Sequence, residues 1–227
     1  MSTRMTRSTR LPAAAPIVLG MALLLAGYGN LNASAANTIP LPGARVVKQQ
    51  PVCAHYKTYG VPRVTPVNPR RTYKATVTTN KGTFTITFYP RVAPIAVESF
   101  LFLAQRHYFD GVSFHRVVPT FVIQGGDPTG SGECGPGYEF KNEKVTQPYA
   151  RGIVAMANAG LNTNGSQFFI MLQNNSLPPN YTIFGKVTSG MNTIDRLTSV
   201  QLGPGSDGTN SSPLTKIYMK SVRVTES

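Results

Sequence analysis

The stretch YKATVTTNKGTFTITFY, residues 73–89, decides the fold class of this chain. β-branched or aromatic residues alternate with polar ones on both sides of Asn80-Lys81-Gly82, which supplies a tight turn. Such alternation is typical of strands that bury one face. The stretch therefore predicts an antiparallel hairpin.

A helix is expected next, because Pro94 suits a first turn and apolar residues recur at three- and four-residue steps as far as Ala104, giving one apolar face. Short strands and a second helix near 190–198 follow between loops rich in Gly, Pro and Asn. The expected strands cover 113–118, 120–124, 152–156, 167–172, 181–187 and 214–225. Since closure removes sheet edges, we predict a mainly β domain: a closed eight-stranded antiparallel barrel capped by two α-helices.

The charge of the chain is unevenly placed. Its 227 residues carry 22 Lys and Arg against 9 Asp and Glu, a net charge of +13, with 41% hydrophobic residues, enough for a packed core. Residues 1–35 hold +3 and residues 36–72 hold +6, both without an acid, so residues 73–227 hold only +4. That value is too small to indicate a nucleic-acid partner, and none is expected.

The first 35 residues resemble a secretory signal. Three arginines precede an apolar run of about 16 residues, and Ala33-Ser34-Ala35 offers small residues for cleavage after Ala35. An uncleaved membrane anchor is the alternative, although a span needs roughly 20 residues. Tyr28 stands where a lipoprotein signal has its cysteine, so no lipid is expected there. We expect the chain to be exported, either released or retained in the cell envelope.

Three regions are expected: a signal peptide (1–35), a linker (36–72) and a globular domain (73–227). The linker holds six prolines and six basic residues, which predicts a semi-extended spacer that is either solvated or laid on an anionic polymer. The chain's two cysteines, Cys53 and Cys134, could form one disulfide in an exported protein. A metal site at Cys53-Ala54-His55 is the less favoured alternative because no acidic ligands accompany it.

Three motifs carry most of the special residues. They are FHRVVPTFVIQGGDPTGSG (114–132), VAMANAGLNTNGSQFFI (154–170) and LPPNYTIFGKV (177–187). They contain neither a Ser/His/Asp arrangement, nor paired carboxylates, nor a phosphate loop. They offer instead one arginine, several side-chain amides and several aromatic rings, an inventory that suits a peptide-binding surface.

These motifs closely resemble the cyclophilins, the peptidyl-prolyl cis-trans isomerases, since FHR, IQGGD, MANAG, NTNGSQFF and FGKV occur in the family's order across residues 73–227. The resemblance implies a catalytic role for Arg116, for which a surface ion pair is the alternative. It also implies a peptide-binding site without cofactor or metal. The implied site residues are Phe121, Val122, Gln124, Gly132, Ala157, Asn158, Gln167, Phe169, Leu177 and Tyr181. For Phe121 and Phe169 the alternative is ordinary barrel core, and His115 is expected to be structural.

Several positions depart from the family pattern. Val122 stands where many members have Met, Ser176 where cyclosporin-sensitive members have Trp, and Tyr181 where those members have His. Tight cyclosporin binding is therefore not expected. Cys134 replaces a glycine of the Gly-rich loop, which favours the disulfide.

The resemblance implies an isomerase that accelerates rotation about X-Pro bonds, and the signal-like N-terminus indicates that it assists the folding of exported proteins. We expect it to be a monomer. Its expected partners are proline-containing peptides and unfolded exported chains. A binding module that holds proline segments without turnover is the second hypothesis. A polyanion-binding protein that acts through residues 36–72 is the third.

Overall fold

The computed structural model describes residues 37–54 and 56–227. The predicted signal peptide, with Ala35 and Tyr28, and His55 lie outside the described residues. The helices are η2 (Pro51–Cys53, a 3-10 turn), α1 (Pro94–Gln105) and α2 (Met191–Thr198). The strands are β1 (Ile39–Pro40), β2 (Arg45–Val46), β3 (Arg63–Val64), β4 (Tyr73–Thr79), β5 (Gly82–Phe88), β6 (Arg116–Val118), β7 (Val122–Gly125), β8 (Tyr138–Glu139), β9 (Ile153–Met156), β10 (Phe168–Met171), β11 (Ile183–Ser189), β12 (Leu202–Pro204), β13 (Asn210–Pro213) and β14 (Met219–Glu226).

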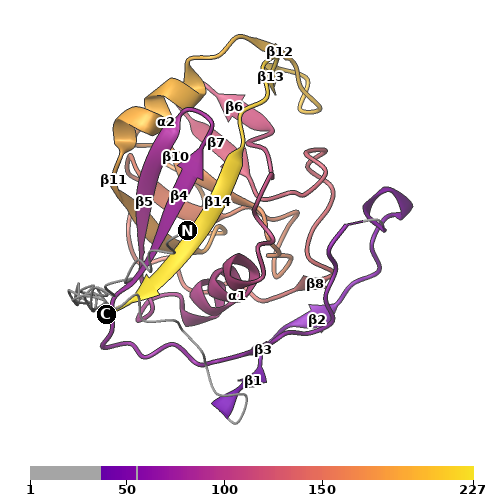
Figure 1. Ribbon diagram of the computed structural model, residues 1–227, viewed down its shortest axis with the longest axis vertical. Helices are drawn as coiled ribbons and strands as arrows, with labels where there is room; N and C mark the ends of the chain where they lie inside the picture. The colour runs from indigo at the N-terminus through magenta and orange to yellow at the C-terminus, as the bar shows by residue number, and fades with distance from the viewer. Residues whose placement is uncertain (1–36, 55) are drawn as a thin grey trace, which may run out of the picture.

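Eight of these strands form one antiparallel sheet in the order β14-β4-β5-β11-β9-β10-β7-β6 (Figure 1). The mainly β architecture and the two helices are confirmed, but the predicted closed barrel is wrong. Within the described residues no ladder joins the edge strands β14 and β6, and the seam is spanned only by a bridge between Ser113 and Tyr218 and by backbone hydrogen bonds between residues 111–114 and 217–219. The sheet is therefore an open, curled half-barrel.

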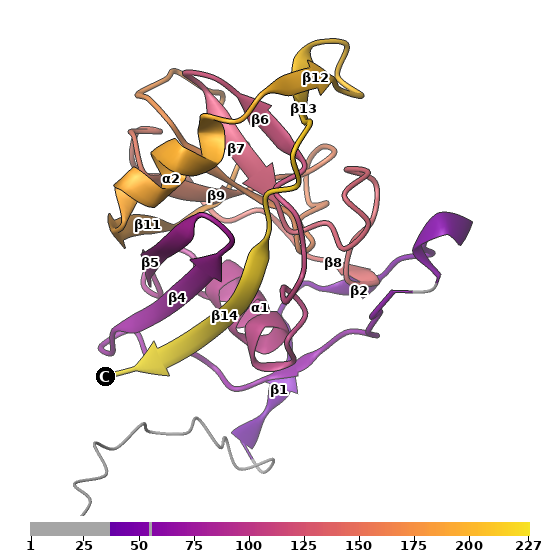
Figure 2. The ribbon, with the colours of Figure 1, turned by 45° about the horizontal axis from the view of Figure 1, so that its top comes forward.

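The last strand is shorter than the strand expected over 214–225. β14 begins only at Met219, and Asn210–Pro213 pairs with β12 instead. The resulting β12–β13 hairpin lies at the top of Figure 2, beside β6. Its turn is closed by the Gly205 N–H, which donates to the Thr209 carbonyl at 2.7 Å, and by the Gly208 N–H, which donates to the Gly205 carbonyl at 3.1 Å.

The predicted hairpin at 73–89 is present, and its alternation explains its packing. β4 and β5 pair in register from Lys74 opposite Thr87 to Thr79 opposite Gly82, and one face of each strand is buried. The concave side of the sheet holds the main core. Phe100 of α1 stacks there on Phe109 with ring centroids 4.7 Å apart and packs on Phe88 at 5.1 Å. The packed rings fix α1 against the sheet.

The helix α1 differs from the prediction of one apolar face, because residues 95–104 are all buried. Its outer side is covered by the N-terminal segment, by which we mean the described part of residues 37–72. Tyr59 of this segment packs edge-on against Phe102, with ring centroids 5.3 Å apart. Leu41 and Val64 of the segment are also buried in the main core.

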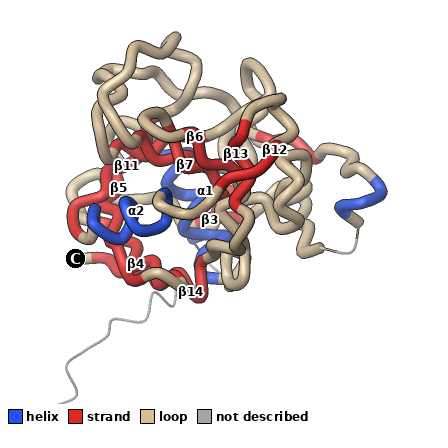
Figure 3. Tube along the Cα trace, turned by 90° about the horizontal axis from the view of Figure 1, so that it is seen from above, coloured by secondary structure: helices blue, strands red, loops and turns tan. Residues whose placement is uncertain are grey.

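The N-terminal segment is extended and runs beside α1 toward β8 (Figure 1). Strand β1 pairs with β3, and β2 pairs with β8. In Figure 3 the stretch around η2, in blue at the right, projects from the edge of the molecule. The described residues contain no helix long and apolar enough to cross a membrane.

Candidate active site

The strand register places a row of predicted site residues on one face of the sheet. Arg116 lies opposite Gln124, Gln124 opposite Phe169, and Phe169 opposite Ala155. Directly opposed residues in a sheet project to the same side. Arg116, Gln124 and Phe169 therefore share the convex face of the half-barrel.

The apolar residues of these strands divide between the two faces by alternation. Phe168 and Ile170 enter the main core, whereas Phe169 and Met171 enter a second hydrophobic cluster, here called the outer cluster. The buried members of the outer cluster are Val122, Tyr149, Ile153, Ala155, Phe169, Met171 and Ile183, and partly buried Tyr89, Phe121, Val145, Ala150, Ala157, Leu177 and Tyr181 pack against them. Phe121 and Phe169 are thus outside the main core.

Tyr181 and Leu177 are positioned by the loop that precedes β11. The Tyr181 ring stands edge-on to Phe169, with centroids 5.6 Å apart. The Tyr149 hydroxyl donates to the Tyr181 carbonyl at 2.9 Å, which fixes the loop. Leu177 and Tyr149 line a hollow of about 600 Å³ beside the cluster. Six of the predicted site residues thus meet in the outer cluster: Phe121, Val122, Ala157, Phe169, Leu177 and Tyr181.

Arg116 is partly exposed and held by a carboxylate that the sequence did not point to. Its Nε donates to Oδ2 of Asp207 at 2.8 Å, and 29% of its side chain is exposed. Asp207 lies in the β12–β13 loop, where its Oδ1 accepts from the Ser211 hydroxyl at 2.7 Å. The bonds from Ser211 and then Arg116 hold the pKa of Asp207 well below its usual range. The carboxylate therefore stays ionised beside the guanidinium.

A chain of amides leads from the arginine row to the Gly-rich loop. Gln124 donates from Nε2 to Oε1 of Gln167 at 3.0 Å, and Gln167 donates to the Gly132 carbonyl at 2.8 Å. Buried Asp127 organises the loop, because its Oδ2 accepts from the backbone N–H groups of Gly132 at 2.6 Å and Cys134 at 3.2 Å. The amide side chains are thus pre-oriented.

Two predicted site residues that directly follow β9 lie on the other side of these amides. Ala157 donates its backbone N–H to the Gln167 carbonyl at 3.0 Å, and Asn158 donates to the Asn180 carbonyl at 2.9 Å. A hollow of about 600 Å³, here called the polar groove, unites five predicted site residues: Gln124, Gly132, Ala157, Asn158 and Gln167. The polar groove therefore adjoins the outer cluster at Ala157.

His115 lies beneath the Gly-rich loop, next to Gly130 and Gly132. Both ring nitrogens are buried without a hydrogen-bond partner, and desolvation lowers the pKa of the imidazole. A neutral ring packed under a loop is the arrangement of a structural histidine. No group of three or more His, Cys, Asp or Glu side chains among the described residues is placed to hold a metal ion.

The geometry is that of an apolar pocket flanked by a guanidinium and by oriented amides. The family model for cyclophilin-type peptidyl-prolyl cis-trans isomerases matches residues 74–224. This chain belongs to the cyclophilins. The expected activity class, that of the rotamases, is thereby confirmed.

Curated relatives are named peptidyl-prolyl cis-trans isomerases. The cyclophilin is 48% identical over 134 residues to peptidyl-prolyl cis-trans isomerase CYP18-2 of Arabidopsis thaliana, covering 56% of this chain and 82% of that one. It is 38% identical over 175 residues to probable peptidyl-prolyl cis-trans isomerase B of Mycobacterium tuberculosis, covering 69% of this chain. The match spans only 56% of the mycobacterial protein.

Solved structures agree with the fold. A cyclophilin-type isomerase of Cryptosporidium parvum superposes with a TM-score of 0.63 at 33% identity, covering 67% of this chain and 97% of that one. A second crystal structure of that protein, with a TM-score of 0.61, was determined in the presence of the dipeptide Ala-Pro. The coarse expectation that the family binds proline-containing peptides is therefore supported.

Sequence reasoning missed two parts of this cyclophilin's site. Asp207 lies 91 residues from Arg116, and only its Asp-Gly turn hinted at an ordered loop. Gln49 and Gln50 of the N-terminal segment line the polar groove. The predicted disulfide between Cys53 and Cys134 was the signal that could have placed them there, because the bond is present in the structure.

Proposed function

We propose that this cyclophilin accelerates rotation about X-Pro bonds with Arg116 as its catalytic residue, acting on proline-containing segments of exported proteins. The observation that carries the proposal is the register that puts Arg116, Gln124 and Phe169 on one face, beside the outer cluster. The proline ring is assigned to the outer cluster, at Phe121, Val122, Phe169 and Leu177, with Tyr181 on its rim.

The chemistry needs no covalent step. Rotation about a peptide bond passes through a twisted amide, and the lost resonance sets a barrier of about 18–20 kcal/mol. The twisted nitrogen becomes pyramidal and regains a lone pair, which a guanidinium stabilises selectively over either planar form. Arg116 has its Nε held by Asp207, so its two terminal nitrogens remain for the substrate. The rigid fork of the guanidinium suits this task better than a lysine ammonium.

The side-chain amides orient the bound peptide. Gln124 and Gln167 are hydrogen-bonded to each other, and Asn158 is held by the Asn180 carbonyl, so each enters the complex with its rotamer already selected. Gly132 and Ala157 leave room for the peptide along the polar groove.

A protease-coupled assay of X-Pro isomerisation tests the catalytic assignment. Arg116→Ala is expected to lower kcat/KM by about 10² to 10³, the range for removing one donor that acts on the transition state. Arg116→Lys should recover only part of the loss. The matched control is Arg91→Ala, an exposed arginine whose Nε donates to the Pro69 carbonyl away from the site. Unchanged turnover in Arg116→Ala would overturn the assignment.

Export and folding assistance rest on the signal-like residues 1–35 and on the disulfide, since such bonds persist in oxidising compartments. We expect cleavage near Ala35, no lipid at Tyr28 and a monomer that binds cyclosporin weakly. The intact and reduced masses of the protein recovered from its source test the cleavage, the absence of lipid and the disulfide, whereas sedimentation and a cyclosporin titration test the last two points. A chain that keeps residues 1–35 would contradict the proposed cleavage.

A peptide-binding module without turnover is the second candidate. The ion pair between Arg116 and Asp207 favours it, because a neighbouring carboxylate offsets part of the charge that would act on the amide nitrogen. Wild-type protein that binds proline peptides without accelerating their isomerisation would establish it.

A further inference from the structure

The polar groove has a wall that does not come from the isomerase domain. Val47, Gln49 and Gln50 of the N-terminal segment line it together with Gln124 and Gln167 of the domain. The groove is continuous with the proposed site, because Gln124 belongs both to the arginine row and to the groove. A peptide lying across Arg116 would therefore pass between the domain and the segment.

The wall is fixed at several points. On one side β2 pairs with β8, and the Val47 N–H donates to the Gly137 carbonyl at 3.0 Å. On the other side the Tyr59 N–H donates to the Pro136 carbonyl at 2.7 Å. Gly137 permits this approach, because a Cβ there would lie 2.7 Å from the Tyr59 carbonyl oxygen.

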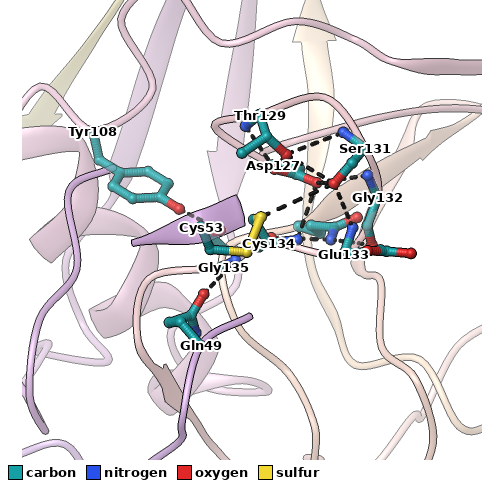
Figure 4. The surroundings of a disulfide bond; sticks show 12 residues. Gln49, Cys53, Tyr108, Asp127, Thr129, Ser131, Gly132, Glu133, Cys134 and Gly135 are labelled. Carbon is teal, nitrogen blue, oxygen red and sulfur yellow. Dashed lines mark hydrogen bonds between the residues drawn. A yellow bond between two sulfur atoms is a disulfide. The ribbon is translucent and has the colours of Figure 1, made fainter. Parts of the chain in front are cut away.

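The disulfide joins the wall to the Gly-rich loop. Cys53 follows Gln50 in the turn of η2 and is bonded to Cys134, which itself lines the polar groove. Figure 4 shows Gln49 beside this bond, where its Oε1 accepts a long hydrogen bond of 3.4 Å from the Gly135 N–H. The Cys134 N–H in turn donates to Asp127 at 3.2 Å, so the wall is covalently tied to a loop that Asp127 holds.

The lining indicates what the groove would bind. Among its polar side chains, amides and hydroxyls outnumber charged groups: Gln49, Gln50, Gln124, Asn158, Thr163, Ser166 and Gln167 all contribute. Of the two acids in the lining, Glu139 is paired with Arg45 at 2.9 Å and Glu133 is exposed. Amides both donate and accept, so they pair with uncharged polar side chains and leave apolar ones without partners.

We propose that the N-terminal segment, tethered by the Cys53–Cys134 bond, makes the polar groove a specificity site for an uncharged polar side chain that flanks the substrate proline. The inference rests on the proposed function, because the occupant is the same peptide whose proline lies in the outer cluster. Gln49 and Gln50 are the residues of the segment that select the side chain.

Peptides that differ by one side chain test the proposal. Asn and Leu, which are similar in shape, are compared at each of the three positions before and after the proline of one parent peptide, and kcat/KM is measured by exchange NMR. Wild-type protein is expected to favour Asn over Leu by about three- to tenfold at one position, as one or two hydrogen bonds allow. In Gln49→Ala/Gln50→Ala this ratio should fall to between about one and two.

The ratio is internal to each protein, so a change in overall turnover does not affect it. Gln105→Ala is the matched control, because Gln105 is an exposed glutamine at the end of α1 outside the groove. It should keep the wild-type ratio. A ratio that is the same in the double variant and in wild type, or a wild-type protein without a preference at any position, would overturn the proposal.

A second measurement needs no variant. Titration of the preferred peptide into wild-type protein should shift the backbone and side-chain amide resonances of Gln49 and Gln50. Resonances that do not shift at saturation would contradict the role of these two residues in binding the peptide. Failure of the proposed function appears differently, as binding with these shifts but with no acceleration of any peptide. The two failures are therefore distinguishable.

Discussion

At the residue scale, the catalytic assignment depends on how Arg116 is presented. Neighbouring motif residues point to this arginine, and the register places it beside Gln124. Its partner Asp207 could not be predicted, because the contact joins residues 91 positions apart through a hairpin that the sequence did not reveal. We therefore expect Asp207 to be a positioning residue, which would act on the substrate only through the guanidinium.

Asp207→Ala should lower kcat by about tenfold and leave KM within about twofold, because a guanidinium free to rotate loses the preorganisation that serves the transition state. Asp207→Asn, which keeps an acceptor oxygen for Nε, should recover part of the loss. Steady-state isomerisation kinetics test this split. Asp195→Ala breaks the exposed pair with Arg151 and serves as the control with unchanged kinetics. A loss confined to KM would contradict the positioning role.

Gly126 shows why one glycine of the IQGGD motif is required. Its φ is +95°, and a Cβ there would collide with the Ser166 carbonyl oxygen and lie 3.0 Å from the Gln167 Cα. Gly111 has a φ of +84° with open space around its Cβ position. Gly111→Ala should therefore cost about 1 kcal/mol of unfolding free energy for the backbone conformation alone, and Gly126→Ala should cost about 2 kcal/mol more for the collision. Urea denaturation of both variants tests the difference, and equal losses would contradict the account.

At the element scale, local patterns predicted the hairpin and both helices because their signals lie within a few residues. The short strands β12 and β13 were missed because they contain no β-branched or aromatic residue. The opening of the barrel could not be predicted, since it depends on which distant partner an edge strand finds. The burial of α1 on all sides was missed for a similar reason. A segment without apolar periodicity covers the outer side of the helix, and only single residues such as Tyr59 make the contact.

The junction between α1 and the N-terminal segment contains a buried acid. Glu98 is 6% exposed, its Oε1 accepts from the Val67 N–H at 3.0 Å, and its Oε2 has no partner. Desolvation raises the pKa of this carboxyl above its usual 4.5. The folded state therefore holds the proton more tightly than the unfolded state.

The stability that Glu98 contributes is complete below about pH 4.5 and is lost as pH rises through the raised folded-state pKa. Glu98→Gln keeps the oxygen that faces Val67 and removes the charge. The unfolding free energy of wild type relative to this variant should therefore fall between pH 4 and pH 8, as measured by urea denaturation at each pH. Glu133→Gln, an exposed acid, is the control that should show no such trend. A difference in unfolding free energy between wild type and Glu98→Gln that does not change with pH would refute the assignment.

At the scale of the whole molecule, part of the positive charge of the N-terminal segment lies in contacts with the domain. Arg45 pairs with Glu139, Lys57 donates to the His107 carbonyl, and Arg71 lies 3.2 Å from Glu226. Three of the six basic residues of the segment thus contact the domain, which weakens the argument for a polyanion partner. The sequence predicted the excess charge but not these contacts, because ion pairs between distant residues leave no local pattern.

The Cys53–Cys134 disulfide closes a loop with a sequence separation of 81. Reduction should lower the unfolding free energy by about 2–4 kcal/mol, because the unfolded chain regains the freedom of that loop. Urea denaturation with and without reductant measures the loss. Cys53→Ser/Cys134→Ser is the control and should be insensitive to reductant. Equal stability of oxidised and reduced wild type would show that the bond constrains nothing.

The most direct test of the central claim, catalysis by Arg116, is exchange NMR on one X-Pro peptide at equilibrium, with binding and cis-trans exchange measured in the same sample. Wild-type protein is predicted to bind the peptide and to accelerate exchange far beyond the uncatalysed reaction, which takes about tens to hundreds of seconds. Arg116→Ala is predicted to shift the same resonances of the outer cluster while its exchange rate falls by about 10² or more. Exchange that is as fast in Arg116→Ala as in wild type would contradict the account.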